Sequence, residues 1–251
     1  MKNILLALAV LLASVTPAKA DLILAGDIGG VLFCATDNNT VCNYGVQLTD
    51  DNALVGILSL NSVNIGGLQV EGSLHSETSD GITNILSSSS LSILNTTALA
   101  ISLQASIGAT DFIGPATEGF TTGSGTWVSS QGSSTTYTWW NDPNNAQGGE
   151  TATDREGIMI DSFSDIAGAQ TLDSFSHNGG PFPLIDFGPL FSMTLGFDMT
   201  LLAGDSLISR GQSEIADVTA VPEPASIFLF GSGLAALIRR QTKKKKVIVV
   251  A

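Results

Sequence analysis

The residues of this sequence that could do acid–base chemistry are few. His75 and His177 are the only histidines, and both are predicted to lie in turns, GSLHSETSDG and SFSHNGG. With a serine and a carboxylate, either could serve as the general base of a hydrolase. No Gly-x-Ser-x-Gly elbow in a strand-then-helix context and no phosphate-loop or dinucleotide motif is found, and Gly123-Ser124-Gly125 is predicted to be a turn. The sequence therefore assigns no catalytic residue.

Several predicted turns are rich in carboxylate and amide oxygens. They are Asp37-Asn38-Asn39, Asp50-Asp51-Asn52, Asp142 with Asn144 and Asn145, and Asp154 with Glu156. Calcium takes about six to eight hard oxygen ligands, so these are the candidate calcium ligands. None matches the EF-hand loop, and ordinary turns favour the same residues. We assign no cofactor and no metal ligand, and calcium stays an open alternative.

Large amphipathic aromatic side chains cluster in one part of the chain, at Trp127, Tyr137, Trp139 and Trp140. On the surface of a sheet such rings form a platform for sugars; in its interior they are ordinary core. Trp139 and Trp140 point to opposite faces of a regular strand. One of the two is therefore expected outside the core.

Alternating hydrophobicity predicts the strands that would position these groups. In Phe191–Leu201 every odd position is large and apolar and every even position is small or polar, which predicts a half-buried strand. Residues 68–74 and 99–107 alternate in the same way, and residues 137–140 form another candidate. Only residues 160–172 have a pattern typical of a short helix or a loop.

Many short strands with Gly and Asn turns, and without alternating helices, predict an antiparallel β-sandwich or jelly-roll body. All but Glu223 of the 23 acidic residues lie between Asp21 and Ala220, against only two of the ten Lys and Arg residues, Arg155 and Arg210, so this body has a net charge of −20. Phosphate backbones attract basic surfaces. The charge therefore excludes a nucleic-acid partner and favours solubility outside the cell.

The N-terminal residues 1–20 have the pattern of a signal peptide. Lys2 precedes an apolar stretch from Ile4 to Val15, and Ala18 and Ala20 are small residues at the positions that signal peptidase recognises. Cleavage after Ala20 would leave Asp21 as the first residue. A retained N-terminal anchor is the alternative.

Cys34 and Cys42 are the only two cysteines. An even number in an exported chain indicates a disulfide, and the turn-forming residues between them favour a hairpin that brings the sulfurs together. Closing so short a loop stabilises the fold by about 2–3 kcal/mol. Two free thiols or two metal ligands are the alternatives, although the spacing is unusual for zinc.

The C-terminus has three consecutive parts. A stiff hexad comes first, because each proline fixes φ and disfavours helix in the residue before it; it is Val221-Pro222-Glu223-Pro224-Ala225-Ser226. Residues 225–238 are uncharged and largely apolar, and as a helix they would span about 21 Å of a hydrocarbon core about 30 Å thick. Basic residues follow and favour the cytoplasmic side; they are Arg239, Arg240, Lys243, Lys244, Lys245 and Lys246.

This order of hexad, apolar segment containing Gly-Ser-Gly, and basic cluster resembles the PEP-CTERM sorting tail of Gram-negative bacterial proteins. The resemblance covers residues 221–246. It implies recognition of Pro222, Glu223 and Pro224 by an exosortase, an integral membrane enzyme described as a cysteine transpeptidase, which would remove the helix and the basic tail. It also implies a bacterium that makes extracellular polysaccharide. Residues 247–251 extend beyond the point where the family commonly stops, so removal of the tail stays open.

We therefore expect three segments: a signal peptide (1–20), an extracytoplasmic β-rich domain (21–220) and a sorting tail (221–246). The chain would cross the inner membrane, stay anchored there transiently through a transmembrane helix, and then reach the cell surface or matrix. Its expected role is non-enzymatic, structural or adhesive, in association with exopolysaccharide. A surface-polymer hydrolase and a permanently anchored protein are the alternatives.

Overall fold

The computed structural model describes residues 21–79, 83–128, 131–169, 171–184 and 188–216. All of them belong to residues 1–217, the first of two units into which the chain divides. They form strands and one short 3₁₀-helix, which confirms the prediction of a mainly β body. None of the helices among the described residues has the length and apolar character needed to span a membrane. The predicted signal peptide (1–20) and transmembrane helix (225–238) lie outside the described residues.

The strands form two sheets, and every pairing is antiparallel except that of β2 with β3. The seven-stranded sheet contains, in spatial order, β10 (Ile158–Ile166), β9 (Ser134–Asp142), β12 (Leu190–Leu201), β7 (Ile101–Ile113), β1 (Leu22–Ile28), β2 (Val31–Thr36) and β3 (Val46–Gln47). The six-stranded sheet contains β11 (Leu172–Pro183), β8 (Glu118–Val128), β13 (Ser206–Ala216), β6 (Thr83–Asn95), β5 (Leu68–Ser79) and β4 (Ile57–Ile65).

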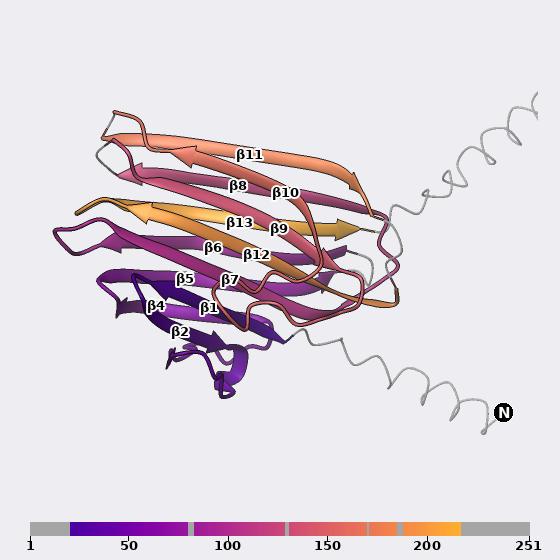
Figure 1. Cartoon of the computed structure of the whole chain (residues 1–251). Coiled ribbons are helices and arrows are strands. Elements are labelled where there is room, and N and C mark those ends of the chain that lie inside the picture. The colour runs from indigo at the N-terminus through magenta and orange to yellow at the C-terminus, as the bar shows by residue number, and fades with distance from the viewer. Residues whose placement is uncertain (1–20, 80–82, 129–130, 170, 185–187, 217–251) are drawn as a thin grey trace, which may run out of the picture. The chain divides into compact units, whose positions relative to one another are not determined.

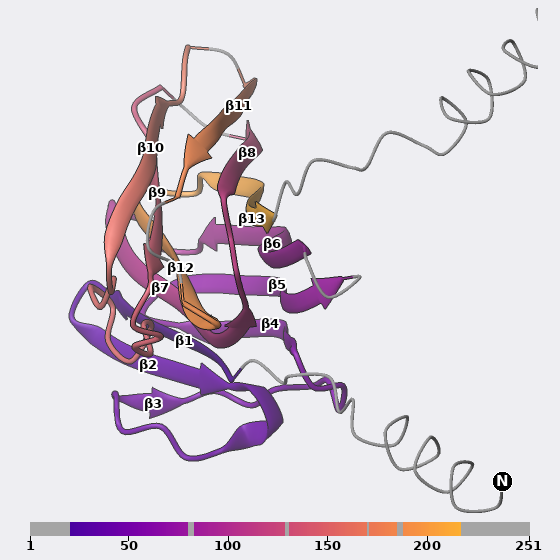
Figure 2. The same cartoon turned by 90° about the vertical axis from the view of Figure 1, so that its right-hand side faces the viewer.

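The two sheets lie face to face as a β-sandwich, with β10 and β11 along the same edge (Figures 1 and 2). Their inner faces supply the core, whose largest fully buried side chains are Trp127, Trp139, Tyr137, Phe112, Phe191 and Phe197. Burying one such side chain contributes about 1.5–3 kcal/mol. The three aromatics of this core that the sequence marked as candidate sugar contacts are therefore packing residues, and only Trp140 is partly exposed.

The predicted strand at Phe191–Leu201 is confirmed as β12, and its odd positions all face the core. The prediction that it is half-buried is wrong, because Ser192, Thr194 and Gly196 on its other face are buried as well. The connection between β9 and β10 covers two of them, since Gly148 lies against Thr194 and Arg155 against Gly196. This connection, residues 143–157, is called the covering loop below.

The prediction of a helix or loop at residues 160–172 is wrong for residues 160–166, which are a strand. This stretch contains most of β10, which pairs with β9 in the register Phe163↔Tyr137, and the start of β11. Its period of two is hidden because the half-buried positions of β10 carry carboxylates, Asp161 and Asp165, on either side of Phe163. Hydrophobic periodicity fails where inward positions are polar.

Other predicted turns are also strands. Gly123 and Gly125 lie within β8, where they make room for rings: a Cβ on Gly123 would lie 3.5 Å from the Trp139 ring, and one on Gly125 would lie 2.5 Å from Phe175 Cζ. A glycine inside a strand often marks such a close approach. His75 lies in β5 and His177 in β11, so the turns predicted for both histidines are wrong.

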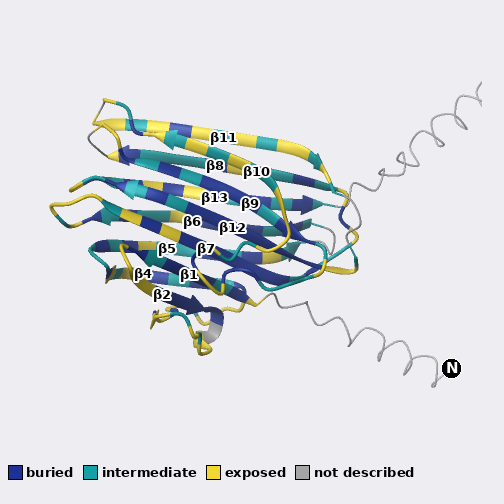
Figure 3. Ribbon diagram, in the orientation of Figure 1, coloured by how far each residue is buried: buried dark blue, intermediate teal, exposed yellow. Residues whose placement is uncertain are grey.

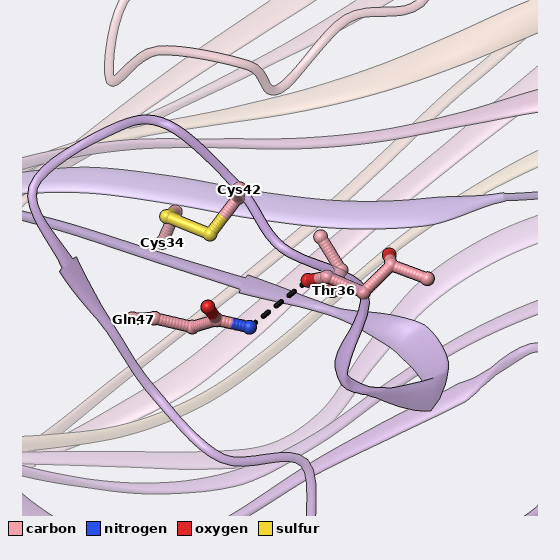
Figure 4. The surroundings of a disulfide bond; sticks show 5 residues. Cys34, Thr36, Cys42 and Gln47 are labelled. Atoms are coloured by element: carbon pink, nitrogen blue, oxygen red, sulfur yellow. Dashed lines mark hydrogen bonds between the residues drawn. A yellow bond between two sulfur atoms is a disulfide. The ribbon is translucent and has the colours of Figure 1, made fainter.

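The disulfide between Cys34 and Cys42 is confirmed, with 6.3 Å between the two Cα atoms (Figure 4). The predicted hairpin is not formed. The chain instead passes from β2 through the 3₁₀-helix η1 (Asp37–Asn39) and returns to pair β3 in parallel with β2. Gln47 Nε2 donates to the Thr40 carbonyl at 2.9 Å, so the side chain of β3 holds the loop that the disulfide closes.

Candidate functional site

The covering loop closes the outer face of the seven-stranded sheet over β7 and β12. Ser106 Oγ donates to the Ala152 carbonyl at 2.9 Å. Arg155 donates two hydrogen bonds to the Asp198 carboxylate, at 2.8 and 2.7 Å. A Cβ on Gly108 would collide with the backbone of Gly148, so the loop lies directly on the sheet. Beside these contacts the same face has a pocket of about 390 Å³, lined by Ile23, residues 40–44 and the loop residues Glu150 and Thr151.

The outer face of the six-stranded sheet carries an open groove of about 340 Å³. Small hydroxyl side chains, one isoleucine and one arginine form most of its lining, and the outward-facing members are Ser90, Ser124, Thr126, Ser174, Ile208 and Arg210. Figure 3 shows the exposed positions along β11, the strand that forms one side of this face. We call this the serine groove.

Strand register explains why these side chains gather. Hydrogen-bonded neighbours on one face of a sheet stand side by side, and in β13 the inward Leu207 alternates with the outward Ile208. The resulting rows cross β11, β8 and β13, and they are Ser174–Thr126–Ile208 and Ser176–Ser124–Arg210. The hydroxyls of Thr126 and Ser174 are 3.2 Å apart, and the groove therefore presents donors and acceptors in line.

Arg210 is the electrostatic feature of the serine groove. The described residues include two arginines and no lysine. Arg155 is paired with Asp198, whereas Arg210 is exposed and has no salt bridge or side-chain hydrogen bond within the part of the chain that the structure describes. A guanidinium offers five donors in a planar fork that matches a carboxylate. The groove can therefore donate strongly at one position and weakly along its length.

His177, one of the two histidines that the alternative hydrolase hypothesis would use, lies at the sandwich edge, between the sheets. Its Nε2 is 2.7 Å from Asp161 Oδ2 across from β11 to β10. The ring stacks between Trp139 and Phe163, with centroids 5.5 and 4.8 Å away. The Thr121 hydroxyl donates to the same Asp161 oxygen. The hydroxyl is thus held by the carboxylate and not by the imidazole, which is not the arrangement of an activated nucleophile.

His75 is hydrogen-bonded to a serine, the partner that His177 lacks, within the part of the chain described, for a Ser-His-Asp site. Its Nε2 is 3.0 Å from Ser73 Oγ, which is 2.9 Å from Ser89 Oγ. These groups lie on the outer face of the six-stranded sheet, and no carboxylate bonds to His75 among the described residues. One histidine is paired with a serine and the other with an aspartate, and among the described residues neither histidine bonds to both.

The candidate calcium ligands are used by the turns that contain them. Asp50 Oδ1 accepts from the Asn52 and Ser59 amides, both at 2.9 Å. Asp142 accepts from the Ala146 amide at 2.8 Å. Elsewhere the Asp154 carboxylate raises the pKa of the exposed Glu156. Within the described ranges, no three or more His, Cys, Asp or Glu side chains are grouped so that they could hold a metal.

Sequence reasoning missed the serine groove. Serines are too numerous to single out by type, and their faces depend on the register of β8, β11 and β13. One signal was visible, since Arg210 is one of only two bases between residues 21 and 220.

Comparison with known families identifies one motif, near the C-terminus. Residues 220–244 match the PEP-CTERM protein-sorting motif, which confirms the predicted resemblance. The matched stretch contains the hexad 221–226, and it lies outside the described residues. The chain therefore carries the sorting signal of an exosortase substrate. No curated protein matches the chain.

Solved structures similar to the chain include carbohydrate-binding modules and a virus. The module TmCBM61 in complex with beta-1,4-galactotriose is 9% identical with a TM-score of 0.32, over 60% of this chain and 88% of that chain. The module CBM6cm-2 from Cellvibrio mixtus lichenase 5A, in complex with cellotriose, is 14% identical with a TM-score of 0.25, over 60% and 89%. Infectious bursal disease virus Gx strain is 15% identical with a TM-score of 0.33, over 84% and 54%. With TM-scores this low, these structures do not identify a ligand for the chain.

Proposed function

We propose that this protein is exported, sorted by an exosortase and released to the cell surface or extracellular matrix, where its body acts as a structural or adhesive component associated with exopolysaccharide. The observation that carries the proposal is the sorting motif at residues 220–244. The acidic body and the disulfide are consistent with it, because disulfides persist in oxidising compartments outside the cytoplasm.

The proposed order of events matches the order of segments along the chain. Signal peptidase cleaves after Ala20 during export. The apolar segment 225–238 then holds the chain in the inner membrane, with the basic cluster 239–246 on the cytoplasmic side. Exosortase recognises Pro222, Glu223 and Pro224 and removes the apolar segment and the basic cluster, which frees the body of residues 21–220.

Intact-mass measurement of the surface form tests this order. The expected mass begins at Asp21 and excludes residues 227–246. Replacing Pro222 and Pro224 with alanine is expected to leave the longer form in the membrane fraction. A surface form of the wild type whose mass includes residues 227–246 would contradict sorting and support a permanently anchored protein.

The proposed association with polysaccharide is supported by the serine groove, whose hydroxyls and guanidinium suit a sugar. Retention of the mature protein on purified matrix polysaccharide, with and without calcium, tests it. Retention in both conditions is the expected result. No retention in either would contradict it, and retention only with calcium would restore the calcium alternative.

A hydrolase of surface polymers is the second candidate, because His177 and Asp161 are 2.7 Å apart. We propose instead that the body is not an enzyme, since the Thr121 hydroxyl at this pair donates to the carboxylate. The assay is release of reducing ends from matrix polysaccharide. The expected result is no release above background; release that disappears in His177→Gln, with the fold retained, would favour the hydrolase.

A further inference from the structure

We infer that the serine groove binds a carboxylated sugar, a uronic acid unit within an otherwise neutral polysaccharide, and that Arg210 contacts its carboxylate. This inference rests on the proposed association with polysaccharide and names the class of sugar. It concerns the outer face of the six-stranded sheet, which is not part of the sorting motif at residues 220–244.

The size of the groove suits a short segment of a polymer. Its volume of about 340 Å³ is at the lower end of the range of ligand sites, about 300–1,000 Å³. The groove is open to solvent and runs across β11, β8 and β13. A chain of sugars can therefore enter and leave without an end being required, as binding within a long polysaccharide demands.

The lining matches the chemistry of a sugar ring. Serine and threonine hydroxyls both donate and accept hydrogen bonds, as sugar hydroxyls do, and Ser124, Thr126 and Ser174 supply them from two neighbouring strands. Ile208, half-exposed in the same row as Thr126 and Ser174, offers an apolar contact for the C–H groups of a ring. No aromatic platform is needed for this mode of contact.

The charge of the groove selects an acidic unit. Arg210 stands in a row with Ser124 and Ser176, so its neighbours across the sheet carry no charge. The bidentate pair of Arg155 with Asp198, at 2.7 and 2.8 Å, shows how an arginine of this fold engages a carboxylate. Arg210 has no such partner in the described part of the chain. A uronate carboxylate would supply it.

The charge of the whole body sets the density of acidic units. A net charge of −20 between residues 21 and 220 repels a densely charged polyanion. A single carboxylate flanked by neutral sugars can reach Arg210 with less repulsion from the acidic body than a row of closely spaced carboxylates. The ligand class is therefore a polysaccharide with isolated uronic acids.

The test uses two probes that differ in one group. The first is a glucose oligosaccharide that contains a single glucuronic acid unit, and the second is the same oligosaccharide with that carboxyl group reduced to hydroxymethyl. Titration calorimetry with the mature surface protein is expected to show binding of the acidic probe about tenfold tighter than of its reduced twin, as suits one charge-assisted contact. Arg210→Gln is expected to abolish that difference.

Glu77→Gln is the matched control. Glu77 is exposed on β5 of the same sheet, away from the serine groove. Its substitution changes the net charge by +1, whereas Arg210→Gln changes it by −1. It is expected to leave the tenfold preference in place. If Glu77→Gln raises the preference as much as Arg210→Gln lowers it, the effect is one of overall charge and the inference is overturned.

The remaining outcomes separate the inference from the proposed function. If the wild type binds both probes equally and Arg210→Gln changes neither, the carboxylate contact is overturned while polysaccharide association stands. If it binds neither probe yet is retained on matrix polysaccharide, the uronate assignment is again overturned alone. If it binds neither probe and is not retained, both the inference and the proposed binding fail.

Discussion

The two outer faces of this sandwich are built from similar residues and are used differently. On the seven-stranded sheet, Ser106, Thr194 and Gly196 face outward, yet the covering loop buries them. On the six-stranded sheet, Ser124, Thr126 and their neighbours face outward and remain open. The covering loop can lie on the seven-stranded sheet because Gly108 and Gly196 have no Cβ atoms that would collide with it. Residue type therefore does not show which polar face is structural and which is free.

The two arginines of the body repeat this contrast. Arg155 comes from the covering loop and pairs with Asp198 on the closed face. Arg210 lies on the open face without a carboxylate partner in the described ranges. We expect the first to stabilise the fold and the second to serve binding.

Gly108→Val should break the comparison most severely. A side chain at this position would meet the backbone of Gly148, so the covering loop could not lie on the sheet, and the free energy of unfolding should fall by about 3 kcal/mol. Urea denaturation measures it. Ser176→Thr, which also adds bulk but on the open face, is the control and should change stability by less than about 0.5 kcal/mol. Equal losses in both variants would show that the faces do not differ.

The core between the two faces should lose stability in strong alkali. Burial raises the pKa of Tyr137 from 10.0 to about 12. Side-chain hydrogen bonds with Ser209 and Thr135 lower this pKa by smaller amounts. The stability that the buried, neutral Tyr137 contributes is fully present below pH 10. It is lost as pH rises towards 12, because Tyr137 ionises at lower pH in the unfolded chain than in the folded one. The loss amounts to about 2–3 kcal/mol. Unfolding free energies of the wild type and Tyr137→Phe across this range test it. Parallel pH curves would mean that the tyrosine is not sealed in the core.

Arg155→Met should lower stability by about 1–2 kcal/mol, because it leaves Asp198 without its partner. The value is modest since the Asp198 side chain is 34% exposed and solvent screens it. The double variant with Asp198→Asn should lose less than the sum of the two single changes. Polysaccharide retention should be unaffected, and a loss of retention would place the ligand on the closed face instead.

Arg210→Met should have the smallest effect on stability, within about 0.5 kcal/mol, while weakening retention on polysaccharide. It is the counterpart of Arg155→Met on the other face, since both substitutions remove one positive charge and keep a flexible apolar side chain. Thermal unfolding and a retention assay on the same samples compare them. A destabilisation as large as that of Arg155→Met would show that Arg210 has a structural role.

The fold could be predicted where apolar residues occupy the inward positions. In β12 every inward residue from Phe191 to Leu201 is large and apolar, so the strand was evident. In β10 the half-buried positions include Asp161 and Asp165, which are hydrogen-bonded to His177 and Trp127 from the opposite sheet. Sequence cannot supply those partners, so the strand resembled a helix or loop.

The candidate site could be predicted only in part. The sorting motif depends on contiguous residues and was recognised directly at its matched positions, 220–244. The serine groove depends on Ser174, Ser124 and Arg210, which are far apart in sequence and meet only through strand register. The role of the aromatic residues also depends on the fold: Trp127 and Trp139 are core residues because they lie on the inward faces of β8 and β9.

The central claim is that polysaccharide binds the open face and not the closed one. A matched pair of serines on the two edge strands tests it: Ser174 lies on β11 beside the groove, and Ser164 lies on β10 of the other sheet, both exposed. The only native cysteines, Cys34 and Cys42, form a disulfide, so Ser174→Cys and Ser164→Cys can each be labelled with a bulky maleimide.

Retention of the two labelled proteins on matrix polysaccharide is the decisive measurement. The label at position 174 should abolish retention, and the label at position 164 should leave it as in the unlabelled protein. Retention that survives the label at position 174 and is lost with the label at position 164 would contradict the account.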